Sequence, residues 1–134
     1  MTGACLCRGV RFEVAQDFEA VVACHCTTCK KISGGAGTVS GRVRASAVHL
    51  HAGEELLRTY QPAEGTGKTF CSVCGSNVFG GGWPDAERVS VRLSTLDEPF
   101  ERKPETRLYV RSVAPWETLP DDGAERADTR PTHF

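Results

Sequence analysis

Seven cysteines in three tight clusters constrain the fold of this chain more than any other feature of its sequence. The clusters are a Cys-x-Cys pair at 5–7, a Cys-x-Cys-x-x-Cys triplet at 24–29 and a Cys-x-x-Cys pair at 71–74. An odd number of cysteines cannot pair completely into disulfides, and a cytosolic chain would keep its thiols reduced. Closely spaced thiolates are instead the donors that zinc takes from neighbouring residues. The clusters therefore predict metal binding rather than inert or redox-active thiols.

The number of cysteines suggests how two metal ions would share them. Zinc takes four protein ligands in a structural site, and three plus an open position in a catalytic site. The site with four ligands would combine the two pairs, Cys5 with Cys7 and Cys71 with Cys74. The site with three ligands would use the triplet, Cys24, Cys26 and Cys29. Because the two pairs are far apart in the sequence, the four-ligand site would couple metal binding to folding.

Other assignments of the cysteines and histidines stay open at this point. The triplet could take a fourth ligand from a histidine or cysteine, leaving some thiols unused, or could hold an iron–sulfur cluster. Adjacent residues on a tight turn rarely reach one ion, so we expect His25 to point outward, where it could contact substrate or relay a proton. His49 and His51 are two residues apart and share a face of an expected strand, which we interpret as solvated. His133, near the end of the chain, has no predicted role.

Apolar and polar residues alternate along much of the chain with the period of half-buried strands. The clearest examples are residues 10–14 and 89–93. Shorter candidate strands are residues 20–23, 38–43, 48–51, 56–60, 68–70, 78–79 and 108–111. No segment has a sustained helical period, so helices should be single turns, over 27–32 and 44–47. The pattern predicts a mainly β domain of many short strands.

Composition and charge limit the partners of the protein. Sixteen basic and 17 acidic residues leave a net charge of -1, and no basic block favours nucleic-acid binding. The longest apolar stretch, residues 20–24, is too short to span a membrane, and the first residues lack the features of a signal peptide. We therefore expect a soluble, cytosolic protein. Because the apolar pattern ends after Trp116, we expect one domain over 1–118 and a polar, flexible tail over 119–134.

Several motifs, taken in order, resemble one protein family. They are Cys5-x-Cys7, Val10-x-Phe12, CHCTTCKKISG at 24–34, FCSVCGS at 70–76, LDEP at 96–99 and SVAPW at 112–116. Together they are similar to the glutathione-dependent formaldehyde-activating enzyme family, which includes centromere-protein-V-like members. The resemblance extends from about Gly3 to Trp116, and the combination of CHCxxC with a downstream FCxxCGS is specific.

The resemblance implies a β-tent zinc-binding fold of short antiparallel strands with two zinc ions per chain. Its structural zinc would be held by Cys5, Cys7, Cys71 and Cys74. Its catalytic zinc would be held by Cys24, Cys26 and Cys29. The implied activity is that of a carbon–sulfur lyase, which joins formaldehyde to a small-molecule thiol, glutathione, to give S-(hydroxymethyl)glutathione, or catalyses the reverse reaction.

Two residues depart from the pattern of the family. Arg8 stands where the family usually has glycine, so the turn there should not rely on a left-handed glycine. Arg107 stands near a position where many relatives carry histidine. We expect the chain either to lack the function of that histidine or to recognise a more anionic ligand.

The charge of a three-thiolate zinc site narrows the chemistry further. Three thiolates and Zn²⁺ sum to -1, which makes the metal a weak Lewis acid and argues against hydrolase chemistry. Such a site suits a soft sulfur ligand, whose added charge needs compensation. Lys30 and Lys31 are candidates for that compensation or for substrate binding, and His25 for proton transfer. The alternatives are a non-catalytic zinc scaffold with a closed second site and, with less support, a nucleic-acid-binding zinc protein.

Overall fold

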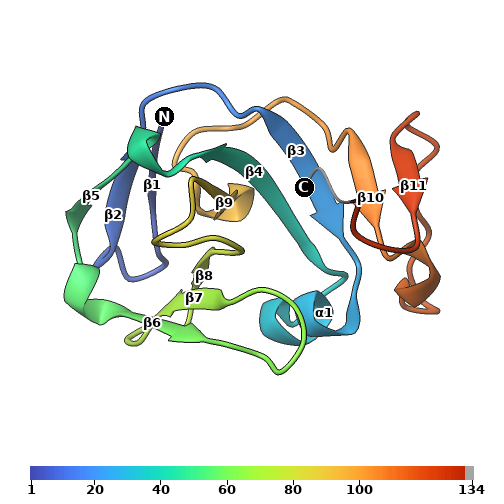
Figure 1. The fold of residues 1–134 in the computed structure, drawn as a ribbon, viewed down its shortest axis with the longest axis horizontal. Helices are drawn as coiled ribbons and strands as arrows, with labels where there is room; N and C mark the ends of the chain where they lie inside the picture. Colours follow the sequence, from blue (N-terminus) through green and yellow to red (C-terminus); the bar gives the residue numbers. More distant parts are fainter. Residues whose placement is uncertain (132–134) are drawn as a thin grey trace.

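Short strands are the main regular secondary structure of the computed structural model, which describes residues 1–131 (Figure 1). His133 and the last residues of the predicted tail lie outside the described residues. The strands are β1 (Thr2–Ala4), β2 (Arg11–Val14), β3 (Ala20–Cys24), β4 (Thr38–Arg44), β5 (Val48–Ala52), β6 (Leu57–Tyr60), β7 (Lys68–Cys71), β8 (Asn77–Phe79), β9 (Arg88–Arg92), β10 (Thr106–Leu108) and β11 (Glu125–Ala127). The prediction of a mainly β fold of short strands is confirmed.

The strands form two sheets. A three-stranded sheet has the order β1-β2-β5, and an eight-stranded sheet has the order β11-β10-β3-β4-β9-β8-β7-β6. Most neighbours are antiparallel, as expected, but β10 runs parallel to both β3 and β11. Parallel neighbours need a long connection, and residues 109–124 provide one between β10 and β11.

The hydrophobic core lies between the two sheets. Phe12 from the small sheet contacts Phe79 from the large sheet, with ring centroids 5.3 Å apart, and Trp83 stacks on Phe79. Val89 and Val91 of β9 are fully buried on the same side. Because successive strand residues point to opposite faces, Ser90 between these valines and Arg92 after them lie on the other face of the large sheet.

The only α-helix of the described residues, α1 (Thr27–Ser33), follows β3 directly. The Cys26 side chain caps its N-terminus, and Gly34 in the left-handed conformation ends it. It is therefore longer than the single turn predicted. The predicted turn at 44–47 is a 3-10 helix over Ala45–Ala47. No helix within residues 1–131 has the length and apolar character needed to cross a membrane.

The predicted strand at 108–111 is wrong in its position. Strand β10 ends at Leu108, because Tyr109 adopts a left-handed backbone (φ 55°) and residues Val110–Ser112 form a 3-10 helix. Further along, Glu125–Ala127 forms β11 at the edge of the large sheet, in a segment where the sequence indicated no strand. The sequence did not indicate this strand because the segment is polar and lacks the alternation of a half-buried strand. Backbone pairing with β10 holds it, together with the ion pair between Arg107 and Asp122 in the segment before it. The domain boundary at residue 118 stays a prediction.

Candidate metal centres and the adjoining cavity

The two cysteine pairs meet in a four-cysteine site. The Sγ atoms of its members all lie within 4.8 Å of one another, and the members are Cys5, Cys7, Cys71 and Cys74. The Cys5–Cys7 and Cys7–Cys71 sulfur distances are 3.5 and 3.9 Å. A tetrahedron with zinc–sulfur bonds of about 2.3 Å has edges of about 3.8 Å. The donors and their spacing therefore fit one metal ion.

Two tight turns hold these cysteines together. In the second turn, the Gly75 N–H donates to the Cys71 carbonyl at 2.8 Å, with Gly75 in the left-handed conformation. The Leu6 N–H donates to Ser76 Oγ at 2.8 Å and so links the two turns directly. The Ser76 hydroxyl also lowers the pKa of Cys74 to about 5, and thus favours the thiolate that a metal requires.

Arg8 corrects one expectation from the sequence. Its backbone is left-handed (φ 62°), so the first turn uses this conformation even without glycine. The Arg8 N–H donates to the Cys5 carbonyl at 3.0 Å, and its side chain pairs with Asp97 at 3.0 Å. These contacts hold a conformation that costs a non-glycine residue about 1–2 kcal/mol.

The triplet forms a separate three-cysteine site. The Sγ atoms of Cys24, Cys26 and Cys29 also lie within 4.8 Å of one another. Cys24 is the last residue of β3, Cys26 is the N-cap of α1, and Cys29 lies in the first turn of the helix. The Cys29 N–H donates to Cys26 Sγ at 3.3 Å. Three thiolate donors fit a metal ion, and within residues 1–131 no fourth potential ligand joins them.

His25 does not point outward as expected. Its side chain is buried, and Nδ1 lies 3.1 Å from the Ala36 carbonyl oxygen. Its neighbours Cys24 and Cys26 point into a cavity, whereas His25 is not among the residues that line it. Consecutive residues on an extended backbone project to opposite sides, which separates His25 from the sulfurs.

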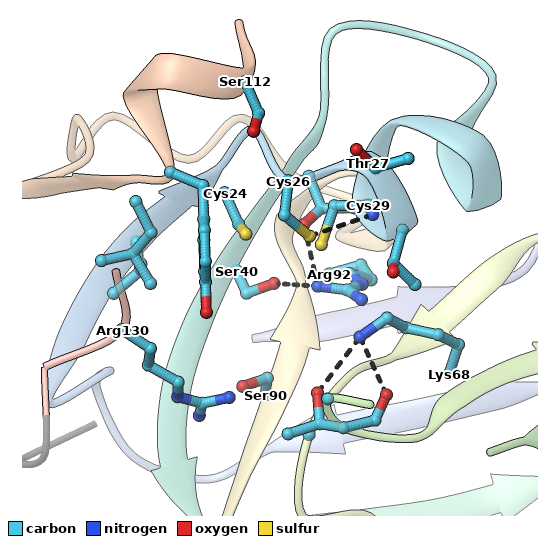
Figure 2. Close-up of a pocket in the computed structure, with 18 of the residues that line it drawn as sticks. Cys24, Cys26, Thr27, Cys29, Ser40, Lys68, Ser90, Arg92, Ser112 and Arg130 are labelled. Carbon is cyan, nitrogen blue, oxygen red and sulfur yellow. Dashed lines mark hydrogen bonds between the residues drawn. The ribbon is translucent and has the colours of Figure 1, made fainter. Parts of the chain in front are cut away.

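A cavity of about 370 Å³ adjoins the three-cysteine site (Figure 2). One wall consists of β3, β4 and β9, on the face opposite the core. The β4 residues Thr38, Ser40 and Arg42 line it in alternation, and Ser90 and Arg92 of β9 line it beside them. The three sulfurs lie at one end of this wall.

Two buried cations face the sulfurs. Arg92 donates through Nε to Asn77 Oδ1 at 2.7 Å and through Nη1 to the hydroxyls of Thr38 and Ser40 at 3.1 and 2.7 Å. Its Nη2 has no hydrogen-bond partner in the described part of the chain. The Lys68 ammonium donates to the Thr66 carbonyl and hydroxyl at 3.0 and 3.1 Å.

The charges of these groups depend on one another. Burial lowers the pKa of both Lys68 and Arg92, and the thiolate of Cys29 opposes that effect. The Cys24 thiol donates to Cys29 and lowers the pKa of Cys29 to about 5, with help from Thr38. The same contact raises the pKa of Cys24. Among residues 1–131, the ion pairs with carboxylates use other cations, so the cysteine thiolates are the counter-charges available to Lys68 and Arg92.

The structure brings different basic residues to the cavity from those the sequence indicated. Lys30 donates from Nζ to the Ser112 carbonyl, Lys31 is exposed, and neither lines the cavity. Their contact with substrate stays a prediction. The basic residues that do line it are Arg42, Lys68, Arg92 and Arg130. Sequence reasoning missed them because polar residues in a strand have the same period on a cavity wall as on a solvated face.

Arg107 also differs from expectation. It does not line the cavity, whereas Leu108, the next residue of β10, does. Its side chain is buried against Asp122, with 2.7 Å between Nη2 and Oδ2, and this contact lowers the pKa of Asp122. The Arg107–Asp122 ion pair therefore stabilises the segment that leads to β11. Arg107 is not placed to contact a ligand in this cavity. The histidines at 49 and 51 are exposed, and His51 lies 3.1 Å from Glu13.

Fold and sites together define a small β protein with a four-cysteine site, a three-cysteine site, and a cavity beside the second. The chain belongs to the glutathione-dependent formaldehyde-activating enzyme family, whose model matches residues 1–112. A protein of Halomonas elongata, provisionally named as a glutathione-dependent formaldehyde-activating enzyme, is 36% identical over 129 residues, covering 87% of this chain and 78% of its own length. The crystal structure of a Rhodobacter sphaeroides protein, a structural genomics target, is similar with a TM-score of 0.61 and 25% identity, over 76% of this chain and 93% of that one.

Proposed function

We propose that this protein is a zinc-dependent enzyme of the carbon–sulfur lyase type. Its reaction would join glutathione and formaldehyde to S-(hydroxymethyl)glutathione, or reverse that addition. The observation that carries the proposal is the three-cysteine site, which has three donors and opens into a cavity of about 370 Å³. This volume is within the range of small-molecule sites. Membership in the family and the name of the Halomonas relative support the choice of substrates.

Two zinc ions per chain would complete the enzyme. Cys5, Cys7, Cys71 and Cys74 would hold the structural ion. A zinc ion held by Cys24, Cys26 and Cys29 would supply an open position for a soft sulfur ligand or a carbonyl oxygen. A closed, non-catalytic site would need a fourth ligand, and the orientation of His25 toward Ala36 argues against that residue.

The charges that surround the sulfurs favour an incoming thiolate. Three thiolates and Zn²⁺ sum to -1, and Lys68 and Arg92 raise the local sum to +1. A substrate thiolate then brings the sum to zero without help from Lys30 or Lys31. Because both cations are buried, little solvent screens them from the sulfurs.

The addition forms a bond between the substrate sulfur and the carbonyl carbon, and the carbonyl π electrons move to oxygen. The proton lost by the thiol is recovered by that oxygen, which becomes a hydroxyl. Lys68 is suited to stabilise the oxygen, since an ammonium has three N–H donors and Thr66 accepts two of them. We propose Lys68 for this role in preference to His25, which is turned away from the cavity.

The test is the rate of adduct formation measured by exchange NMR with ¹³C-formaldehyde and glutathione, on protein with a measured zinc content. We expect zinc-loaded protein to exceed the uncatalysed rate, and Cys26→Ser to abolish the excess. Serine can still accept the N-cap hydrogen bond of α1, so the variant should keep its circular dichroism spectrum. Ser33→Ala, an exposed change on the same helix and outside the cavity, is the control for activity. Fully zinc-loaded protein without acceleration, or an active Cys26→Ser variant, would show that the proposal is wrong.

A further inference from the structure

With a zinc ion at the three cysteines, as proposed above, the charged groups that line the cavity have a net charge of +2. Its lining contains four basic side chains and one carboxylate, that of Glu64. Lys68 and Arg92 face the sulfurs, as described above. Arg42 and Arg130 are the other two, and they need a different counter-charge.

Arg42 and Arg130 both line the cavity, and they are near enough for their charges to interact. Arg42 Nη1 donates to Ser90 Oγ at 3.4 Å, and Ser90 and Arg130 both line the cavity, drawn away from the cysteines in Figure 2. Burial lowers the pKa of Arg42, and the positive charge of Arg130 lowers it further. Two arginines in this arrangement repel each other unless an anion lies between them.

The carboxylate of Glu19 is already paired with other arginines, and Glu64 of the cavity lining forms no ion pair within residues 1–131. Glu19 acts on Arg42 over a longer range, but its Oε2 accepts from Arg88 at 2.6 Å and its Oε1 lies 3.8 Å from Arg44. Within residues 1–131, neither Arg42 nor Arg130 has a carboxylate at ion-pair distance. Arg44 lies on the same strand and the same face, and it has carboxylate partners in Glu19 and Glu87. Arg42 differs from Arg44 in having none.

The strand register gives the distance between the two ends of the cavity wall. Cys24 is paired with Thr38, and Ala20 with Arg42, so the arginine stands four residues along β4 from the level of Cys24. At about 3.3 Å per residue this is about 13 Å between backbone positions. The long Arg42 side chain shortens the span available to a ligand. A thiol with an anionic group several bonds away fits this separation, whereas a two-carbon thiol cannot reach across it.

We infer that Arg42 and Arg130 form an anion-binding subsite that holds a carboxylate of the thiol substrate at the end of the cavity opposite the three cysteines. The inference rests on the proposed function for the thiol itself, and deepens it by assigning the side chains that hold a remote carboxylate of that thiol. Both arginines donate N–H groups that match a carboxylate in pairs. They act in binding and selectivity, since the bond that forms lies at the other end of the cavity.

Kinetics with two thiols test the inference. Glutathione carries carboxylates, and 2-mercaptoethanol does not. We expect Arg42→Gln and Arg130→Gln each to raise KM for glutathione about tenfold or more, and to leave kcat/KM for 2-mercaptoethanol within about twofold. The matched control is Arg44→Gln, which removes an exposed arginine that is paired with Glu87 and lies outside the cavity.

A binding measurement separates this inference from the proposed function. S-methylglutathione keeps the carboxylates and has no free thiol, so calorimetry with zinc-loaded protein reports the subsite without turnover. We expect binding to wild type and Arg44→Gln, and at least tenfold weaker binding to the two subsite variants. Equal binding by all four proteins, or no binding to wild type, would overturn the subsite whether or not the protein is active. Arginine-dependent binding without any acceleration of adduct formation would contradict the proposed function and leave the subsite standing.

Discussion

Removing the four-cysteine site should destabilise the protein more than removing the three-cysteine site. The perturbation is the double variant Cys71→Ser/Cys74→Ser, which takes away both ligands on one side of the four-cysteine site. Cys7 and Cys71 are 64 residues apart, so the metal would close a loop of that length. The ligands of the three-cysteine site lie within residues 24–29, a much shorter loop.

The magnitude follows from the entropy of loop closure. For a cross-link closing 64 residues, the chain-entropy relation gives about 4 kcal/mol of stabilisation at 25 °C, against about 2 kcal/mol for five residues. For a domain of this size, 1 kcal/mol corresponds to about 3.6 °C in Tm. We therefore expect Cys71→Ser/Cys74→Ser to lower Tm by about 14 °C, and the matched variant Cys24→Ser/Cys26→Ser by about 7 °C or less.

The assays are thermal unfolding, for Tm, and urea unfolding, for the free energy, of zinc-loaded protein, both followed by tryptophan fluorescence. Trp83 stacks on Phe79 in the core and should report global unfolding. Wild-type protein treated with a strong chelator should fall to the stability of Cys71→Ser/Cys74→Ser or below. Equal losses in the two double variants, or a loss below about 2 kcal/mol in Cys71→Ser/Cys74→Ser, would refute the argument from loop length.

Three further predictions concern the fold. Arg8→Gly should change the free energy of unfolding by less than about 1 kcal/mol in urea titrations, because relief of the left-handed strain is offset by the lost Asp97 pair and the greater freedom of the unfolded glycine. Asp122→Asn should increase proteolytic cleavage around β11, because it removes the ion pair with Arg107. In wild type the same increase should appear as the pH falls below about 4. Arg107 lowers the pKa of Asp122, and the pair is lost when the carboxylate is protonated. Gly41→Ala should cost about 1–3 kcal/mol in urea unfolding, since the new Cβ would lie 2.3 Å from the ring of Phe18, and an unchanged midpoint would contradict the packing.

The local sequence predicted the strands with regular alternation and the cysteines of the two candidate metal sites. Residues 10–14 and 89–93 alternate because one face of each strand is buried in the core, and this is visible within five residues. The triplet at 24–29 was recognisable because a single turn and the start of one helix bring its sulfurs together. Tyr109 shows the limit of such reasoning, since nothing local indicates that its backbone turns left-handed and ends β10.

The sequence by itself therefore determined a mainly β chain, seven thiols that could hold metal ions, and their division into four and three. Only the tertiary structure decided which cations share the cavity with the thiolates. Lys68, Arg92 and Arg42 come from three strands, and the pairing register of β4 with β9 brings two of them to one wall. Lys30 and Lys31, adjacent to the cysteines in sequence, face elsewhere because a helix rotates successive side chains around its axis. Alternation tells which residues avoid the core, but the same period describes a solvated face and a cavity wall, and only the packing of distant strands distinguishes them.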